Sequence, residues 1–166
     1  MSLGDQSPLF CYLKLSMIDK TKIEMLVLES VKGTGIFLVD IKTGRSEKIS
    51  VFVDNEKGIS LEECASLHRK LEKMLESEAA DFELQVSSPG LSMPFRVIEQ
   101  YYKNIGKKVR VIDNEGKRSE GILKNVTKGG FELETEVREK GKKAELKEIS
   151  FNFDQVKSTH EIVTIK

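Results

Sequence analysis

The chain has 166 residues, of which 27 are basic and 27 acidic, and 39% are hydrophobic. Such a chain can bury the core of one domain or of two small ones. No apolar run approaches the roughly 18 residues of a membrane helix, and two cysteines with two histidines show no zinc-ligand spacing. We therefore expect no metal, no cofactor and no membrane association. Two widely separated cysteines without a secretory segment indicate a reduced, cytoplasmic compartment.

The first residues show no hydrophobic period, and their Met-Ser-Leu start resembles an expression-vector remnant. Met17 directly precedes a helical pattern. We expect residues 1–16 to be a tag or a mis-assigned start and to be disordered.

Charge is unevenly distributed along the chain. Residues 17–90 carry 10 basic and 14 acidic residues (net −4), residues 91–105 carry 2 and 1 (net +1), and residues 106–166 carry 14 and 11 (net +3). This asymmetry fits two surfaces for different partners, and it fits equally well an ordinary solvated, charged exterior.

Residues 17–90 show an α-β-β-α-β order. Asp19 is a candidate N-cap for a helix to about Val31, and two strands near 37–41 and 49–53 flank a hairpin loop. Ser60 and Glu63 form a capping box; the helix that follows precedes a strand at 82–86. The residues expected to be buried in this second helix are Cys64, Leu67, Leu71, Met74 and Leu75. Two helices covering one face of a small, mostly antiparallel sheet make a two-layer α+β domain.

The strand at 82–86 ends in Ser87-Ser88-Pro89-Gly90. Pro89 fixes φ and Gly90 can supply the positive φ of a type II turn. Ser92 is then a candidate cap for a linker helix within residues 91–105, running from about Pro94 to Asn104.

Residues 106–166 show no helical stripe and predict a small all-β domain. Five short strands are expected near 109–111, 122–126, 131–133, 149–153 and 162–165, separated by glycine turns. Five short strands avoid exposed edges by closing into a small barrel. The predicted organisation is thus an α/β domain (17–90), a linker helix (91–105) and a β-barrel domain (106–166).

The serine turn raises the question of catalysis. A serine nucleophile needs a base within reach, whereas His68 is predicted inside a helix and His160 in the other domain. No G-x-S-x-G elbow surrounds the serines, so the pattern disfavours an enzyme. The turn either only ends the strand and connects it to the next helix, or it also binds an anion or a partner's backbone beside a helix N-terminus.

Basic residues gather in the first strands and turns of the predicted barrel and can neutralise phosphates. Few aromatic residues lie among them, which argues against a base-stacking platform. The candidate RNA- or ribosome-binding residues are Lys107, Lys108, Arg110, Lys117, Arg118, Lys124 and Lys128.

Three separated motifs carry a family resemblance: "SVFVDNEKGISLEECASLHRKLEKMLE", "FELQVSSPGLSMPFR" and "YYKNIGKKVRV". In order and spacing they resemble the bacterial ribosome maturation factor RimP family, over roughly residues 17–166. The resemblance implies an α/β domain followed by an Sm-like (SH3-like) barrel. It also implies a non-enzymatic factor that binds the immature small ribosomal subunit in the cytoplasm, promotes its maturation and contacts a small-subunit ribosomal protein.

On this resemblance the partner-binding motif positions are Ser87, Ser88, Pro89, Gly90, Pro94 and Arg96. The chain departs from the family at Ser92-Met93, where Asp-Arg is usual, and Met93 cannot make an arginine's forked contacts. We further hypothesise that the acidic first domain suits a basic ribosomal protein and the basic barrel suits ribosomal RNA. The alternative function is a general RNA-binding adaptor, and a monomer is the default expectation.

Overall fold

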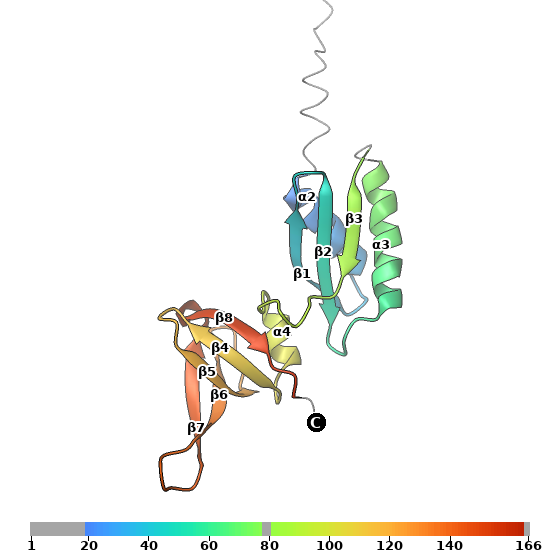
Figure 1. The fold of residues 1–166 in the computed structure, drawn as a ribbon. Coiled ribbons are helices and arrows are strands. Elements are labelled where there is room, and N and C mark those ends of the chain that lie inside the picture. Colours follow the sequence, from blue (N-terminus) through green and yellow to red (C-terminus); the bar gives the residue numbers. More distant parts are fainter. Residues whose placement is uncertain (1–18, 78–80, 165–166) are drawn as a thin grey trace, which may run out of the picture. The chain divides into compact units, whose positions relative to one another are not determined.

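A computed structural model of the chain describes residues 19–77 and 81–164 (Figure 1). The prediction made for residues 1–16 lies outside these described residues. The chain divides into two compact units, the first ending at Ser88 and the second covering Pro89–Lys166.

Unit 1 has the α-β-β-α-β order that the sequence predicts. Its sheet has the order β1-β2-β3, in which β1 and β2 are antiparallel whereas β2 and β3 are parallel. The parallel pair arises because the second helix carries the chain back across the sheet before β3 begins; the sheet is mixed, not mostly antiparallel as predicted. The elements are α2 (Lys20–Val31), β1 (Ile36–Thr43), β2 (Lys48–Asn55), α3 (Leu61–Glu76) and β3 (Glu83–Ser87).

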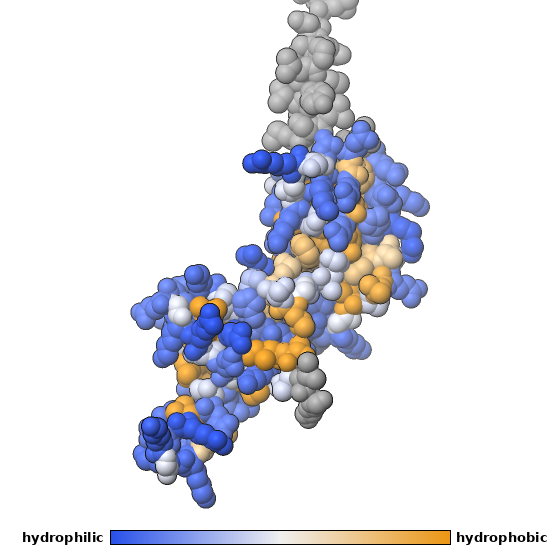
Figure 2. All heavy atoms as spheres, viewed as in Figure 1, coloured by the Kyte–Doolittle hydropathy of each residue, from blue (hydrophilic) through white to orange (hydrophobic). Residues whose placement is uncertain are grey.

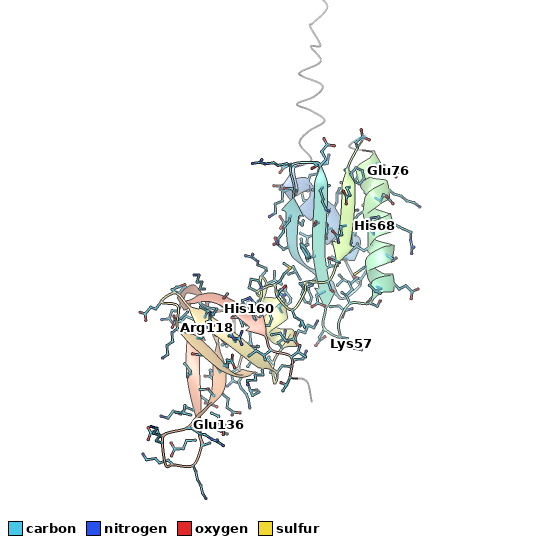
Figure 3. All side chains as sticks on the ribbon, in the orientation of Figure 1. Lys57, His68, Glu76, Arg118, Glu136 and His160 are labelled. Atoms are coloured by element: carbon cyan, nitrogen blue, oxygen red, sulfur yellow. The ribbon has the colours of Figure 1, made fainter. Side chains whose placement is uncertain are left out.

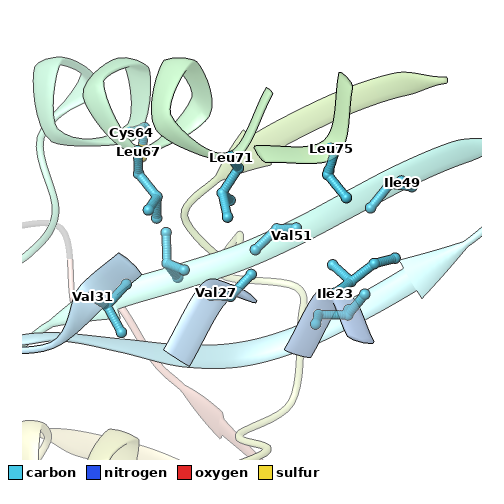
Figure 4. Packing of buried hydrophobic residues seen from close by; sticks show 11 residues of the cluster. Ile23, Val27, Val31, Ile49, Val51, Cys64, Leu67, Leu71 and Leu75 are labelled. Carbon is cyan, nitrogen blue, oxygen red and sulfur yellow. The ribbon is translucent and has the colours of Figure 1, made fainter. Parts of the chain in front are cut away.

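The core of unit 1 is aliphatic and lies between the sheet and both helices (Figure 4). Asp19 accepts a hydrogen bond from the Thr21 amide and starts α2, as expected. Met74 is half-buried, not buried as predicted, because its sulfur lies between the helices and accepts a hydrogen bond from Ser30 Oγ at 3.5 Å. The buried core residues are Ile23, Val27, Val31, Ile41, Ile49, Val51, Val53, Cys64, Leu67, Leu71 and Leu75.

Unit 2 contains one short helix and, in its described part, five strands in a single antiparallel sheet of order β7-β6-β5-β4-β8. A 3₁₀ turn at Phe153–Gln155 separates β7 from β8. The elements are α4 (Ile98–Lys103), β4 (Lys108–Asp113), β5 (Arg118–Lys124), β6 (Gly130–Val137), β7 (Glu145–Asn152) and β8 (Val156–Glu161).

Three strand predictions in unit 2 are wrong in position. The last strand is Val156–Glu161, not 162–165, and Phe153 lies in the 3₁₀ turn rather than in a strand. The polar sequence of β8 hides it from a search for apolar alternation, because its buried residue is Thr159, whose hydroxyl accepts a hydrogen bond from Tyr101 Oη at 2.9 Å. Similarly, β5 ends at Lys124, before Val126.

The core of unit 2 is aromatic. The Tyr101 ring lies 5.0 Å from the rings of Phe95 and Phe153 and 5.1 Å from that of Phe131. Such edge-on and tilted contacts add to the burial of apolar area. Two strand pairs approach so closely that a Cβ on Gly121 would lie 2.4 Å from the Glu134 carbonyl oxygen, and one on Gly130 would lie 2.0 Å from that of Phe151.

The first residues of unit 2 differ from their prediction. Gly90 is not among the glycines with positive φ, so the type II turn is wrong, and a turn forms instead where the Met93 amide donates to the Gly90 carbonyl at 3.0 Å. Ser92 caps no helix, because α4 starts only at Ile98. There the Gln100 side chain accepts from the Arg96 and Val97 amides and supplies the cap.

In the part of the chain that the structure describes, no helix is both long and apolar enough to cross a membrane.

Candidate functional site

Two of the three family-like motifs meet in unit 1, at the end of the sheet where β2 and β3 finish; the third lies in unit 2. Because β2 and β3 run parallel, their C-terminal ends lie side by side, with Phe52 paired to Ser87. Helix α3 packs on β3 and begins after the loop that leaves β2. We call the polar residues gathered here the motif corner: Asp54, Asn55, Ser60, Glu63, Cys64, Ser87 and Ser88.

Asp54 holds the loop between β2 and α3. Its side chain is 7% exposed, and Oδ1 accepts hydrogen bonds from the Asn55 amide at 2.9 Å and the Ile59 amide at 3.4 Å. Gly58 in this loop has φ +93°, a conformation that residues with a side chain rarely adopt. The loop is therefore fixed by a buried carboxylate, together with the packing of Ile59 against the core.

Glu63 ties the loop to the first turn of α3. Its carboxylate accepts from the Ser60 amide at 2.7 Å and from Asn55 Nδ2 at 3.2 Å, while the Glu63 amide donates to Ser60 Oγ at 3.1 Å. The capping box predicted from sequence is thus formed. The hydrogen bonds from Ser60, that of its backbone amide first, lower the pKa of Glu63 and keep the carboxylate charged.

Cys64 connects the corner to the serine turn. Burial, followed by the nearby charges of Glu63 and Asp54, raises the pKa of Cys64, and the backbone of Ser88 opposes this shift only weakly. A thiol with a raised pKa is a poor nucleophile. Cys64 therefore acts as a small buried residue that the end of β3 packs against.

The serines of the turn have no catalytic base in contact. His68 Nε2 lies 3.0 Å from the Leu84 carbonyl oxygen and His68 Nδ1 lies 3.9 Å from Glu72, so the imidazole is engaged elsewhere. In residues 19–77 and 81–164, no hydrogen bond joins a histidine to Ser87 or Ser88 and no group of three ligating side chains could hold a metal. The corner instead contains the exposed Ser88 together with the carboxylates of Asp54 and Glu63, which hydrogen bonds hold in place.

The predicted partner-binding residues divide between the two units. Ser87 and Ser88 belong to the motif corner, whereas the other four lie in the extended segment at the start of unit 2. That segment is fixed to unit 2 through the Phe95 amide, which donates to the Thr159 carbonyl at 2.8 Å, and through the Phe95 ring. Arg96 is exposed and Pro94 half-buried.

Four of the seven candidate RNA-binding cations form ion pairs in unit 2, two of them with Glu120 on the outer face of the sheet. Arg110 Nε lies 2.8 Å and Lys108 Nζ 3.8 Å from Glu120, and the pKa of Glu120 is lowered, first by the hydrogen bond from Arg110. Lys107 pairs with Glu161 at 3.7 Å and Lys124 with Glu134 at 3.6 Å. These carboxylates reduce the positive charge available to a phosphate.

For Lys117, Arg118 and Lys128 the described residues provide no ion pair. Lys117 and Arg118 lie at the start of β5, whereas Lys128 follows its other end, so these three cations do not form one patch. A further basic group, which was not predicted from the sequence, lies in the loop between β6 and β7. It consists of Arg138, Lys140, Lys142 and Lys143. The run "REKGKK" was the available signal.

The chain resembles known proteins over the part that contains the motif corner. The model of the RimP N-terminal domain matches residues 26–92, a range that contains the whole motif corner. A Chlorobium limicola protein named ribosome maturation factor RimP is 35% identical over an alignment of 137 positions that covers 72% of this chain and 78% of the relative. This chain belongs to the RimP family.

Two more relatives carry the same name. The RimP of Porphyromonas gingivalis is 28% identical over 152 residues, 89% of this chain and 100% of the relative. The RimP of Flavobacterium psychrophilum is 32% identical over 96 residues, 57% of this chain, and the chain spans only 62% of that relative. The family resemblance drawn from the three motifs is thus confirmed.

Proposed function

We propose that the protein is a non-enzymatic assembly factor of the cytoplasm that binds the immature small ribosomal subunit and promotes its maturation. The observation that carries this proposal is its membership of the RimP family, whose relatives are named ribosome maturation factors. The two compact units would act as separate binding domains. Unit 2 would correspond to the family's Sm-like barrel.

The motif corner is the proposed docking edge for a basic segment of a small-subunit ribosomal protein. Glu63 stays charged because its pKa is lowered, and Asp54 contributes a second, largely buried carboxylate. Ser88 is exposed and can donate and accept hydrogen bonds. Since residues 17–90 carry a net charge of −4, the surrounding surface favours a cationic partner.

The proposed mechanism is selective binding without bond chemistry. A factor promotes assembly only if it binds the immature arrangement of RNA and protein more tightly than the mature one. A mechanism without catalysis agrees with the raised pKa of Cys64, which makes its thiol a poor nucleophile, and with the contact of His68 to the Leu84 carbonyl oxygen instead of to a serine. Unit 2 would contact ribosomal RNA through cations.

Co-sedimentation with immature and mature small ribosomal subunits, at low and high salt, tests this function. We expect selective binding to the immature particle, which Ser87→Ala/Ser88→Ala weakens and the control Ser66→Ala, an exposed serine of α3 outside the corner, does not. Equal binding to both particles and to unrelated RNA would instead favour a general RNA-binding adaptor. Absence of binding to either particle would refute both functions.

A further inference from the structure

The hairpin of β6 and β7 extends beyond the sheet of unit 2. Strand β6 pairs with β5 only through Glu132–Glu134, whereas its pairing with β7 continues to Val137 and Glu145. From residue 135 onward the hairpin is therefore a two-stranded ribbon that pairs only with itself (Figure 1). No residue from 135 to 148 is buried. Figure 3 labels Glu136 at the base of this ribbon.

The loop that closes the ribbon carries a concentrated positive charge. Residues 138–143, which we call the ribbon tip, contain four basic residues and one acidic residue, a net charge of +3. Lys142 Nζ lies 2.8 Å from Glu139, and Arg138 Nε lies 3.9 Å from Glu136. Within the described residues, Lys140 and Lys143 have no ion pair.

The ribbon tip and the outer face around Glu120 differ in whether their cations have a carboxylate nearby. On that face each of Lys108 and Arg110 has a carboxylate within 4 Å, held by neighbouring strands. At the tip all six residues are exposed, and Figure 2 shows this end of unit 2 in mostly hydrophilic colours. Gly141, with φ +84°, makes the tight turn and adds no side chain between Lys140 and Lys142.

We propose that the ribbon tip binds the phosphate backbone of structured RNA through Lys140 and Lys143. This inference rests on the proposed function and names the surface of unit 2 that would contact RNA. Lysines carry flexible point charges that suit phosphates and require no fixed geometry. A phosphate contact needs only accessible cations and displaces condensed counterions.

The composition of the tip favours RNA over an acidic protein. Stable protein interfaces rely on buried aromatic or aliphatic anchors, and residues 138–143 contain no apolar side chain. The tip also has no aromatic ring on which a base could stack. The expected binding is therefore strongly dependent on salt and weakly dependent on base sequence.

Three variants that each remove two positive charges test the proposal. Lys140→Gln/Lys143→Gln removes the unpaired cations of the tip, Lys108→Gln/Arg110→Gln removes ion-paired cations, and Lys117→Gln/Arg118→Gln removes unpaired cations near the start of β5. The measurement is the dissociation constant of the full chain for a fluorescently labelled RNA stem-loop over a series of salt concentrations. Equal loss of charge keeps long-range attraction comparable among the variants.

For the tip variant we expect the slope of log affinity against log salt to fall by about 1.4 to 1.8, because each lost phosphate contact removes about 0.7 to 0.9. Binding at about 0.1 M salt should then weaken on the order of 30-fold. The ion-paired variant should lose much less. A tip variant that binds like the ion-paired variant, or a wild-type chain that does not bind the stem-loop, would overturn the proposal.

Two additional measurements separate this inference from the proposed function. If the tip variant binds the stem-loop normally but the wild type still selects the immature subunit, the function stands and the ribbon assignment is wrong. If the tip variant instead loses binding to a poly-glutamate peptide while keeping the RNA, the tip recognises acidic protein and the inference is also wrong. Thermal unfolding of each variant confirms that the exposed substitutions leave unit 2 folded.

Discussion

The two units are held together by different physical means. Unit 1 buries aliphatic side chains from two helices and a sheet, whereas unit 2 packs aromatic rings around Tyr101 and anchors that residue with a buried hydrogen bond to Thr159. Aliphatic packing is non-directional and depends on volume. The core of unit 2 depends additionally on the orientation of one polar group, so single substitutions can distinguish the two units.

Their surfaces differ in the same way. In unit 1 the polar motif residues are bonded to one another and form a rigid edge. In unit 2 the cations differ mainly in whether a carboxylate lies nearby, as at Glu120, or does not, as at Lys140 and Lys143. Under the proposed function, unit 1 would recognise its partner through negative charge and hydrogen-bonding groups held on this edge, whereas unit 2 would do so through accessible positive charge. Four predictions test this comparison.

The largest effect is expected in the core of unit 1. Leu71 is fully buried between α3 and the sheet, and Leu71→Ala should lower the free energy of unfolding by about 3 to 4 kcal/mol because it removes apolar contacts and leaves a cavity. Leu61→Ala, at a position that is 90% exposed, is the control and should cost less than about 0.5 kcal/mol. The measurement is urea unfolding followed by far-ultraviolet circular dichroism, to which α2 and α3 of unit 1 contribute most helix.

The corresponding change in unit 2 is Tyr101→Phe. It keeps the ring but leaves the buried Thr159 hydroxyl without its donor, which should cost about 1 to 2 kcal/mol. Burial raises the pKa of Tyr101, so the folded state retains the proton more strongly than the unfolded chain. The contribution of Tyr101 to the stability of unit 2 is thus fully present below the ordinary tyrosine pKa, near 10, and is lost as pH rises through the folded value.

Unfolding at neutral and at high pH, followed by the near-ultraviolet circular dichroism of the aromatic core of unit 2, checks both parts of this prediction. In Tyr101→Phe the decline above about pH 10 should be smaller than in the wild type. An equal decline in both proteins would show that another group causes it.

Much of unit 1 could be predicted from sequence because its signals are local. Hydrophobic spacing and the Ser60–Glu63 capping box determine α3, and both were recognised. The parallel pairing of β3 was not, since strand direction depends on how α3 crosses the sheet. In unit 2, β8 and the start of α4 were misplaced because long-range polar contacts of Thr159 and the cap from Gln100 determine them.

The candidate sites were predictable only in part for the same reason. The motifs identified Ser60, Glu63 and the serine turn, but only the fold brings them together around Cys64. Counting basic residues selected Lys108 and Arg110, and their neutralisation by Glu120 depends on strand register, which pairs Arg110 with Glu120 across β4 and β5. The ribbon tip was missed because its exposure depends on where β6 leaves β5.

A smaller effect is expected at the motif corner. Ser60→Ala removes the side-chain cap of α3 and should cost about 1 kcal/mol.

The pKa of Glu63 is lowered in the folded state, so its contribution to stability is present above the ordinary glutamate pKa and is lost as pH falls through the folded value. Glu63→Gln should therefore make the stability of unit 1 less dependent on pH on the acid side. Acid titration followed by far-ultraviolet circular dichroism measures this, with Glu62→Gln, a neighbouring glutamate of the same turn, as the control.

The smallest effect on stability is expected from Glu120→Gln. The same substitution tests most directly whether ion pairing of surface cations in unit 2 controls RNA binding. The ion pairs of Glu120 with Lys108 and Arg110 are exposed, so the free energy of unfolding should change by no more than about 0.5 kcal/mol. The substitution nevertheless leaves two cations without their carboxylate on one face. If accessible charge governs RNA binding, the dissociation constant for the RNA stem-loop should fall and its salt dependence should steepen. Glu99→Gln, in α4 and without an ion pair in the described residues, removes the same charge and is the control. Equal tightening by both variants would mean that net charge alone matters, and that neither ion pairing on the outer face nor its absence at the ribbon tip determines where RNA binds.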